Sequence, residues 1–208
     1  MTKPTIKPEH SQDILNNAEQ LFSCDEVERA IDAMAAAITQ RLNTRNPLIL
    51  PVMIGGVILA GKLIPKLNFP LQIDYIHATR YRGNTSGSEL HWLKQPEKSL
   101  SEKTILLIDD ILDEGITLAA IMDYCYDKGA SKVLTAVLAE KELEQDKPIQ
   151  KADFTGLTVP NRYVFGYGMD YHEYHRNADG IYASKEEWIK NNMATKLAII
   201  GGTGLTQF

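Results

Sequence analysis

The segment that most constrains this chain is residues 104–117, T-I-L-L-I-D-D-I-L-D-E-G-I-T. A short apolar run ends in the adjacent carboxylates Asp109 and Asp110, and a third carboxylate, Asp113, precedes a glycine and a threonine. Such a run predicts a buried strand, and open α/β sheets bind their ligands at the carboxyl ends of their strands. A glycine-containing turn before a helix suits a phosphate, whereas adjacent acids suit sugar hydroxyls or a metal. Together these features indicate a phosphorylated sugar as the ligand.

The composition restricts the class of protein. The 208 residues suffice for one domain with a substantial core, and 44% hydrophobic and 24% charged residues are typical of globular chains. A net charge of −5 does not favour a nucleic-acid partner. The N-terminus lacks an apolar signal segment, and the longest apolar stretch is too short to span a bilayer. The two cysteines, Cys24 and Cys125, are expected as buried thiols in a reducing cytoplasm.

Strand-like and helix-like segments alternate through most of the chain. Besides the run that ends at Asp109, we predict strands at residues 47–54, 71–78 and 133–139. Helices are predicted at residues 11–22, 23–42, 57–63 and 119–128, the second of them opened by a capping box. This alternation indicates right-handed crossovers and an α/β fold with a mostly parallel central sheet flanked by helices. It stops at Asp153, although residues 181–192 resemble a closing strand and a short helix.

Three further segments carry alternative interpretations. Gly55 and Gly56 join a strand to a helix, where they serve either close backbone approach to a ligand or packing. Residues 80–101 are polar and glycine-rich, which indicates either a lid over a site or a long exposed hairpin. Residues 160–176 are dense in aromatic side chains, which belong either to the core or to a stacking pocket for a planar ligand.

The opening segment and the aromatic-rich segment each resemble a motif of a known family. The sequence I-L-L-I-D-D-I-L-D-E-G-I-T resembles the phosphoribosyl-pyrophosphate motif of the type I phosphoribosyltransferases. The sequence V-F-G-Y-G-M-D-Y-H-E-Y-H-R resembles the V-G-Y-x-x-D-Y-x-x-x-x-R pattern of their hypoxanthine-guanine branch, and Lys141 falls where that branch carries its purine-selecting lysine. The resemblance covers about residues 48–184.

The resemblance implies a particular fold and domain organisation. Residues 1–192 would form one phosphoribosyltransferase domain with the type I fold. Its core would span about residues 45–150, and a small hood would come from residues 1–44 and 151–192. Residues 193–208 form an atypical tail, whose I-I-G-G-T-G-L resembles the start of purine nucleoside or methylthioadenosine phosphorylases. We interpret the tail as either a read-through or fusion remnant or a genuine final strand.

The resemblance also implies an activity in purine salvage. The chain would be a glycosyltransferase that moves the 5-phosphoribosyl group from phosphoribosyl pyrophosphate to N9 of hypoxanthine or guanine, giving IMP or GMP and pyrophosphate. Mg²⁺ would be the cofactor, with two ions expected, and the partner would be a second copy in a homodimer or homotetramer. The alternatives are a xanthine-preferring enzyme and a non-catalytic regulator that binds phosphoribosyl pyrophosphate.

Roles for individual residues follow from the same resemblance. Asp113 would be the general acid/base at N7 of the purine. The sugar donor would be bound by Asp109, Asp110, Glu114, Gly115, Ile116, Thr117, Gly55, Gly56, Arg80, Tyr81 and Arg176. The purine would be bound by Lys141, Tyr163 and Val164, and magnesium by Asp109, Asp110 and Asp170.

The chain departs from the family's pattern at three places. Ile54 stands where a basic residue is usual, and Arg80 precedes Tyr81 where the family has serine, so we hypothesise that Arg80 supplies the missing charge. Glu114 stands where threonine or serine is common. Because a carboxylate repels a phosphate, we expect the Glu114 side chain to turn outward and leave binding to the backbone.

Overall fold

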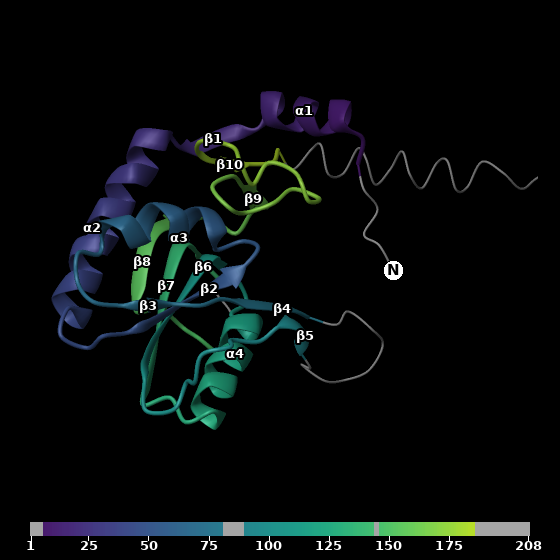
Figure 1. Ribbon diagram of the computed structural model, residues 1–208. Helices are drawn as coiled ribbons and strands as arrows, with labels where there is room; N and C mark the ends of the chain where they lie inside the picture. The colour runs from purple at the N-terminus through teal and green to yellow at the C-terminus, as the bar shows by residue number, and fades with distance from the viewer. Residues whose placement is uncertain (1–5, 81–89, 144–145, 186–208) are drawn as a thin grey trace, which may run out of the picture.

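The computed structural model describes residues 6–80, 90–143 and 146–185 and contains two sheets (Figure 1). The larger sheet has seven strands in this part of the chain, in the order β5-β4-β2-β6-β7-β8, with β3 beside β2. Its strands are β2 Leu48–Met53, β3 Gln72–Ile73, β4 Ile76–Arg80, β5 Leu90–Lys94, β6 Thr104–Leu112, β7 Lys132–Lys141 and β8 Phe154–Val159. All of its pairings are parallel except β4 with β5, which confirms the predicted mostly parallel sheet.

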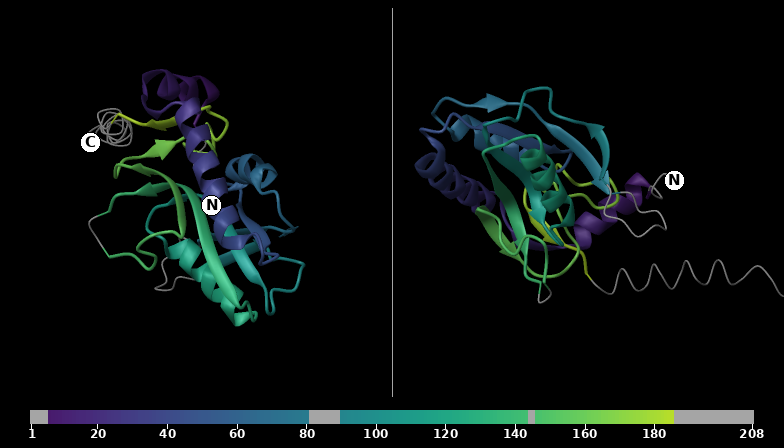
Figure 2. Two further views of the ribbon diagram at one scale, coloured as in Figure 1. Left: turned by 90° about the vertical axis from the view of Figure 1, so that its left-hand side faces the viewer. Right: turned by 90° about the horizontal axis from the view of Figure 1, so that it is seen from below.

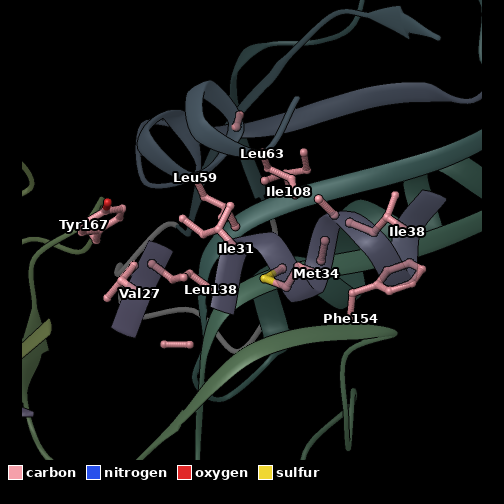
Figure 3. Close-up of a cluster of buried hydrophobic side chains, with 14 of the residues drawn as sticks. Val27, Ile31, Met34, Ile38, Leu59, Leu63, Ile108, Leu138, Phe154 and Tyr167 are labelled. Atoms are coloured by element: carbon pink, nitrogen blue, oxygen red, sulfur yellow. The ribbon is translucent and has the colours of Figure 1, made fainter. Parts of the chain in front are cut away.

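Helices cover both faces of this sheet (Figure 1). They are α2 Cys24–Leu42, α3 Val57–Leu63 with the short 3-10 helix η1 Ile64–Lys66 after it, and α4 Ile116–Asp127. On one face, α2 and α3 bury apolar side chains against β6, β7 and β8, as Figure 3 shows for Ile31, Leu59 and Leu138. On the other face, α4 buries Leu118, Ile121 and Cys125. These two layers form the core of the molecule.

Local sequence signals explain where α2 and α4 begin. The backbone N–H of Ser23 donates to the Glu26 carboxylate at 2.9 Å, and the Ser23 hydroxyl accepts from the Glu26 backbone, so the predicted capping box opens α2. Gly115, at φ +74°, precedes the first residue of α4 in a left-handed conformation that glycine adopts without strain. The apolar face predicted for α2 is buried as expected.

A second, smaller sheet lies at one end of the molecule and joins the two ends of the described chain (Figure 2). Its antiparallel strands are β1 Glu19–Phe22, β10 Ile181–Ala183 and β9 Val164–Phe165, and helix α1 Pro8–Asn17 packs beside it through Ile14. This sheet corresponds to the hood that the resemblance implied. However, α2 and β8 pack with the large sheet, so the small sheet is built from fewer residues than 1–44 and 151–192.

The structure corrects three expectations about secondary structure. The helix predicted at residues 11–22 ends at Asn17, and Glu19–Phe22 forms β1 because it pairs with the distant β10. The strand predicted at 71–78 is two strands, β3 and β4. The parallel strand β8 follows residue 153, where the alternation was predicted to stop. These differences depend on long-range pairing, which local propensity does not encode.

Residues 80–101 start at the last residue of β4 and contain β5, the second arm of a hairpin. Strand β4 pairs antiparallel with β5, with Thr79 opposite His91, which confirms the hairpin interpretation for the arms. Tyr81 and the rest of 81–89 lie outside the described residues, as do the predicted short helix after the closing strand and the tail 193–208. In the described ranges, the structure contains no helix of the length and apolarity needed to cross a membrane.

We predict that the contact of α2 with the large sheet is a main source of stability. Ile31 is fully buried between α2 and the sheet, so Ile31→Ala should lower the free energy of unfolding by about 3 kcal/mol. Gln40→Ala, on the exposed face of the same helix, should change it by less than about 0.5 kcal/mol. Urea denaturation followed by circular dichroism would measure both, and equal losses would contradict the packing described here.

Candidate active site

The carboxyl ends of three neighbouring strands bring the predicted site residues to one edge of the large sheet. Strands β2, β6 and β7 are adjacent and parallel. Gly55 and Gly56 follow β2, Asp113 follows β6, and Lys141 ends β7. Because parallel strands end at the same edge, the loops predicted to bind pyrophosphate, phosphate and purine are neighbours.

The acidic pair lies near the carboxyl end of the central strand β6. Asp110 is only 9% exposed, and its backbone N–H donates to the Asp109 carboxylate at 2.9 Å. Burial raises the pKa of both carboxyl groups, and the neighbouring Asp110 charge raises the pKa of Asp109 further. Two adjacent acids, one half-buried and one buried, are unfavourable as free anions, so hydrogen-bond donors or a cation bound there would stabilise their charge.

Arg176 links the acidic pair to the loop after β9. Its guanidinium donates to the Asp170 carboxylate at 2.8 Å and to the backbone carbonyl of Gly168 at 2.7 Å. The same group lies 3.9 Å from the Asp110 carboxylate, and its charge opposes the rise in the pKa of Asp110. The structure therefore brings Asp110, Asp170 and Arg176 together, although they are up to 66 positions apart in the sequence (176 − 110).

Two glycines allow these segments to meet. A Cβ atom on Gly55 would lie 2.3 Å from the Asp110 carboxylate, and one on Gly168 would lie 2.3 Å from the carbonyl oxygen of Gly55. The loops after β2 and β9 are thus in backbone contact, and the Asp110 side chain lies against both of them. The peptide bond between Met53 and Ile54, just before this contact, is cis. Sequence reasoning selected Gly55 but missed Gly168, for which the paired glycines in G-Y-G were the available signal.

The turn predicted to bind a phosphate has the expected form. Residues 113–115 lead from β6 into α4, whose first turn leaves backbone N–H groups without partners inside the helix. Gly115 packs against Ile149 of the crossover between β7 and β8. Glu114 is exposed, as expected for a side chain that turns outward, whereas Ile116 and Thr117 are half-buried. A helix N-terminus of this kind can bind an anion through its backbone, so the phosphate role of the turn stays a prediction.

The structure pairs two residues to which the resemblance gave separate roles. The Lys141 ammonium lies 2.8 Å from the Asp113 carboxylate, and the Lys141 side chain is only 13% exposed whereas that of Asp113 is 47% exposed. An ion pair shielded on one side is stronger than one in open water. Asp113 is therefore held toward Lys141 in this conformation.

The aromatic residues after β8 divide between core and surface. Val164 and Phe165 are buried in β9, whereas Tyr163, just before them, is 42% exposed. The Tyr163 ring meets Tyr171 edge-on at 5.0 Å and lies parallel to His172 at 6.4 Å. The Tyr163 ring is thus a partly exposed member of this aromatic cluster. Arg80 is described only by its backbone, at the end of β4.

Comparison with known proteins identifies the class to which this site belongs. A family model described as a phosphoribosyl transferase domain matches residues 17–172. The chain therefore belongs to the phosphoribosyltransferase family, and it is an enzyme of that kind. The family resemblance drawn from the sequence is confirmed.

Individual relatives place the chain more closely. A hypoxanthine-guanine phosphoribosyltransferase of Streptococcus pneumoniae is 30% identical over 82% of this chain and 95% of its own length. A hypoxanthine-guanine-xanthine phosphoribosyltransferase of Tritrichomonas foetus is 28% identical over 80% of this chain and 91% of its own. A solved hypoxanthine phosphoribosyltransferase from Staphylococcus aureus superposes with a TM-score of 0.78 at 25% identity, covering 85% of this chain and 96% of that one. The chain is thus similar to 6-oxopurine phosphoribosyltransferases along most of its length.

We predict that the acidic pair lowers the stability of the ligand-free protein. Asp109→Asn removes a charge that burial disfavours, while its side-chain oxygen can still accept from the Asp110 N–H. At neutral pH the free energy of unfolding should rise by about 1 kcal/mol. Asp153→Asn is the matched control, because Asp153 pairs with Arg41 at 2.9 Å and its neutralisation should lower stability. Urea unfolding of both variants would test the difference, and a loss of stability in Asp109→Asn would contradict it.

Proposed function

We propose that the protein transfers the 5-phosphoribosyl group of phosphoribosyl pyrophosphate to N9 of hypoxanthine or guanine, releasing pyrophosphate. Family membership and the names of its relatives support this activity. The single structural observation that carries it is the convergence of the acidic pair, the backbone turn at 113–115 and Lys141 at one edge of the sheet. This edge presents groups suited to a sugar, a phosphate and a 6-oxopurine side by side.

The acidic pair and the turn after it would hold the sugar. Asp109 and Asp110 are acceptors, so they would take hydrogen bonds from the ribose 2′ and 3′ hydroxyls. The backbone N–H groups from Asp113 to Thr117, with the Thr117 hydroxyl, would bind the 5′-phosphate. The exposure of Glu114 supports the expectation that its carboxylate would turn away from the phosphate. These contacts fix the ribose so that its anomeric carbon faces the base.

The pyrophosphate would lie where the loops after β2 and β9 meet. Gly55 and Gly56 would donate from the backbone, and Arg176 would contribute a charged fork that matches phosphate oxygens. The ion pair with Asp170 at 2.8 Å holds Arg176 in place. As the bond to the anomeric carbon breaks, negative charge grows on the leaving pyrophosphate, and a guanidinium fixed beforehand stabilises it.

The ion pair between Lys141 and Asp113 suggests how the purine is recognised. The Lys141 ammonium can only donate, so it would accept the 6-oxo group as a partner and disfavour the 6-amino group of adenine. Asp113, now bound to Lys141 at 2.8 Å, would turn to N7 and exchange a proton there, which tunes N9 as the nucleophile. Tyr163 would stack on the base, and Val164 would meet its edge through backbone atoms.

Magnesium fits the acidic pair. Mg²⁺ is commonly held by one or two carboxylates together with substrate phosphates, and Asp109 and Asp110 supply two adjacent carboxylates, the first half-buried and the second buried. The described residues contain no group of three or more metal-ligating side chains, so the donor and water would complete the shell. Bound magnesium supplies positive charge that neutralises the pyrophosphate. Both oxygens of Asp170 already accept hydrogen bonds, so a second ion bound at Asp170 would share this carboxylate with Arg176 and the Glu173 backbone.

The cellular setting completes the proposal. The two free cysteines, with Cys125 buried, suit a cytoplasmic protein. Assembly as a homodimer or homotetramer is part of the proposal, by analogy with the family. The regulator alternative would need a nucleic-acid surface, which a net charge of −5 does not favour.

The activity is tested by incubating the protein with phosphoribosyl pyrophosphate, magnesium and each of hypoxanthine, guanine, xanthine and adenine. Nucleotide formation from hypoxanthine and guanine is expected, and adenine should be poorer by roughly 10⁴-fold because it leaves the buried lysine without an acceptor. Faster conversion of xanthine would establish the xanthine-preferring alternative. Absence of product from every base would favour the regulator.

Replacing Asp113 separates chemistry from binding. Asp113→Asn should lower kcat by about 10²-fold or more, because the proton exchange at N7 is lost, while the affinity for phosphoribosyl pyrophosphate measured by calorimetry should change little. Asp123→Asn, the same substitution at an exposed position of α4, serves as the control and should keep kcat. An unchanged kcat in Asp113→Asn would show that Asp113 does not take part in the chemical step.

A further inference from the structure

We propose that Tyr167 is a positioning residue for the pyrophosphate end of the sugar donor and that it acts through Glu28 and Lys62. The proposal rests on the proposed function and concerns residues outside the predicted site. Tyr167 lies in the loop after β9, beside Gly168, which contacts Gly55. Glu28 belongs to α2 and Lys62 to α3. The three side chains join the loop after β9, through α2, to α3, the helix that follows the loop after β2.

Tyr167 anchors a turn with an unusual backbone. Its φ is +50°, between Gly166 at +102° and Gly168 at +110°. Positive φ is disfavoured for a residue with a bulky side chain, so surrounding contacts must hold this conformation. The Tyr167 side chain provides such contacts, because it is only 4% exposed and belongs to the same buried cluster as Val27 of α2 (Figure 3). The turn that carries Gly168 is therefore fixed by a ring inserted into the core.

The hydroxyl of Tyr167 extends this anchor to a charged pair. It donates to the Glu28 carboxylate, and the Lys62 ammonium lies 2.7 Å from the same carboxylate oxygen. Burial, together with the negative Glu28, raises the pKa of Tyr167, so the hydroxyl remains a donor. The contacts with Lys62 and Tyr167 lower the pKa of Glu28, so Glu28 remains an anion. Each of the three groups thus keeps the protonation state that the network needs.

The network connects the two loops that contact Asp110: the first follows β2 and the second follows β9. Lys62 lies on α3, the short helix that begins directly after Gly56, so its position follows that of the first loop. Tyr167 directly precedes Gly168, whose carbonyl accepts from Arg176 at 2.7 Å. Glu28 holds both through one carboxylate. A change in this contact would alter the spacing between the backbone donors of the first loop and the guanidinium of the second.

Because the Glu28–Lys62 pair is partly exposed, its effect on ligand positioning can be measured apart from its effect on stability. The side chains of Lys62 and Glu28 are 50% and 28% exposed, and such ion pairs contribute little to folding. Ligand binding is more sensitive, because small displacements of binding groups have large effects on the transition state. A matched pair lies one turn further along α2, where Asp32 meets Lys66 of η1 at 2.6 Å. It joins neighbouring segments without touching Tyr167.

The test compares Tyr167→Phe and Glu28→Ala with the control Asp32→Ala in steady-state kinetics. Tyr167→Phe keeps the ring and removes the hydroxyl. Both variants should raise the KM for phosphoribosyl pyrophosphate, and for pyrophosphate in the reverse reaction, by roughly tenfold. The KM for hypoxanthine and the melting temperature of Glu28→Ala should match those of Asp32→Ala. The KM of the double variant Tyr167→Phe/Glu28→Ala for phosphoribosyl pyrophosphate should be no higher than that of Tyr167→Phe alone, because both substitutions disrupt the same network.

Two outcomes overturn the proposal. Donor KM values of Tyr167→Phe and Glu28→Ala equal to that of Asp32→Ala would show that the network has no positioning role. A parallel rise in the KM for both substrates would show a general structural effect. If Tyr167→Phe does not fold, Glu28→Ala alone decides between these results, since its substitution is at a partly exposed helix position. A wild-type protein that forms no nucleotide refutes the proposed function instead.

Discussion

The carboxylate of Asp110 is the point on which the site depends. It occupies the space where a side chain on residue 55 would be, and it lies 3.9 Å from the Arg176 guanidinium. Because it is buried at the end of the central strand, its charge is unfavourable unless donors or cations surround it. The loop after β2 therefore comes close through glycine backbone, and the loop after β9 brings a guanidinium. One buried charge thus fixes how the large sheet and the small sheet meet.

The rigid part of the fold makes this arrangement possible. Strand β6 is paired on both sides, by β2 and β7, and its core residues are buried on both faces. A strand held in this way positions its last residues with little freedom, as a binding site requires. The turn at Gly115 and the crossover around Ile149 then fix the start of α4. The groups proposed to bind the sugar and the 5′-phosphate are held by backbone and packing, whereas Arg176 is held by its ion pair with Asp170.

The sequence predicted those parts of the molecule that local rules determine. The acidic pair, the turn into α4 and the capping box of α2 were all evident, because each is a short pattern with a direct physical reason. Strands β1 and β8 were missed because their partners lie far away in the sequence. The contact between Asp113 and Lys141 was missed for the same reason, because it depends on the pairing of β6 with β7, which local sequence patterns do not determine. Tyr167 was read only as one aromatic among many, because its link to Glu28 exists only in three dimensions.

The ion pair between Lys141 and Asp113 has a consequence for selectivity under the proposed function. In this conformation the Asp113 carboxylate is paired with the Lys141 ammonium, to which a 6-oxo group would bind. Asp113 is thus an internal competitor, and a base must offer a better partner than a full negative charge to displace it. A 6-oxopurine with a proton on N7 would do so, because the displaced carboxylate would accept a hydrogen bond from N7–H of the same ring. A ring that lacks either feature leaves one of the two residues unpaired, so the protein tests both positions of the base in one exchange of partners.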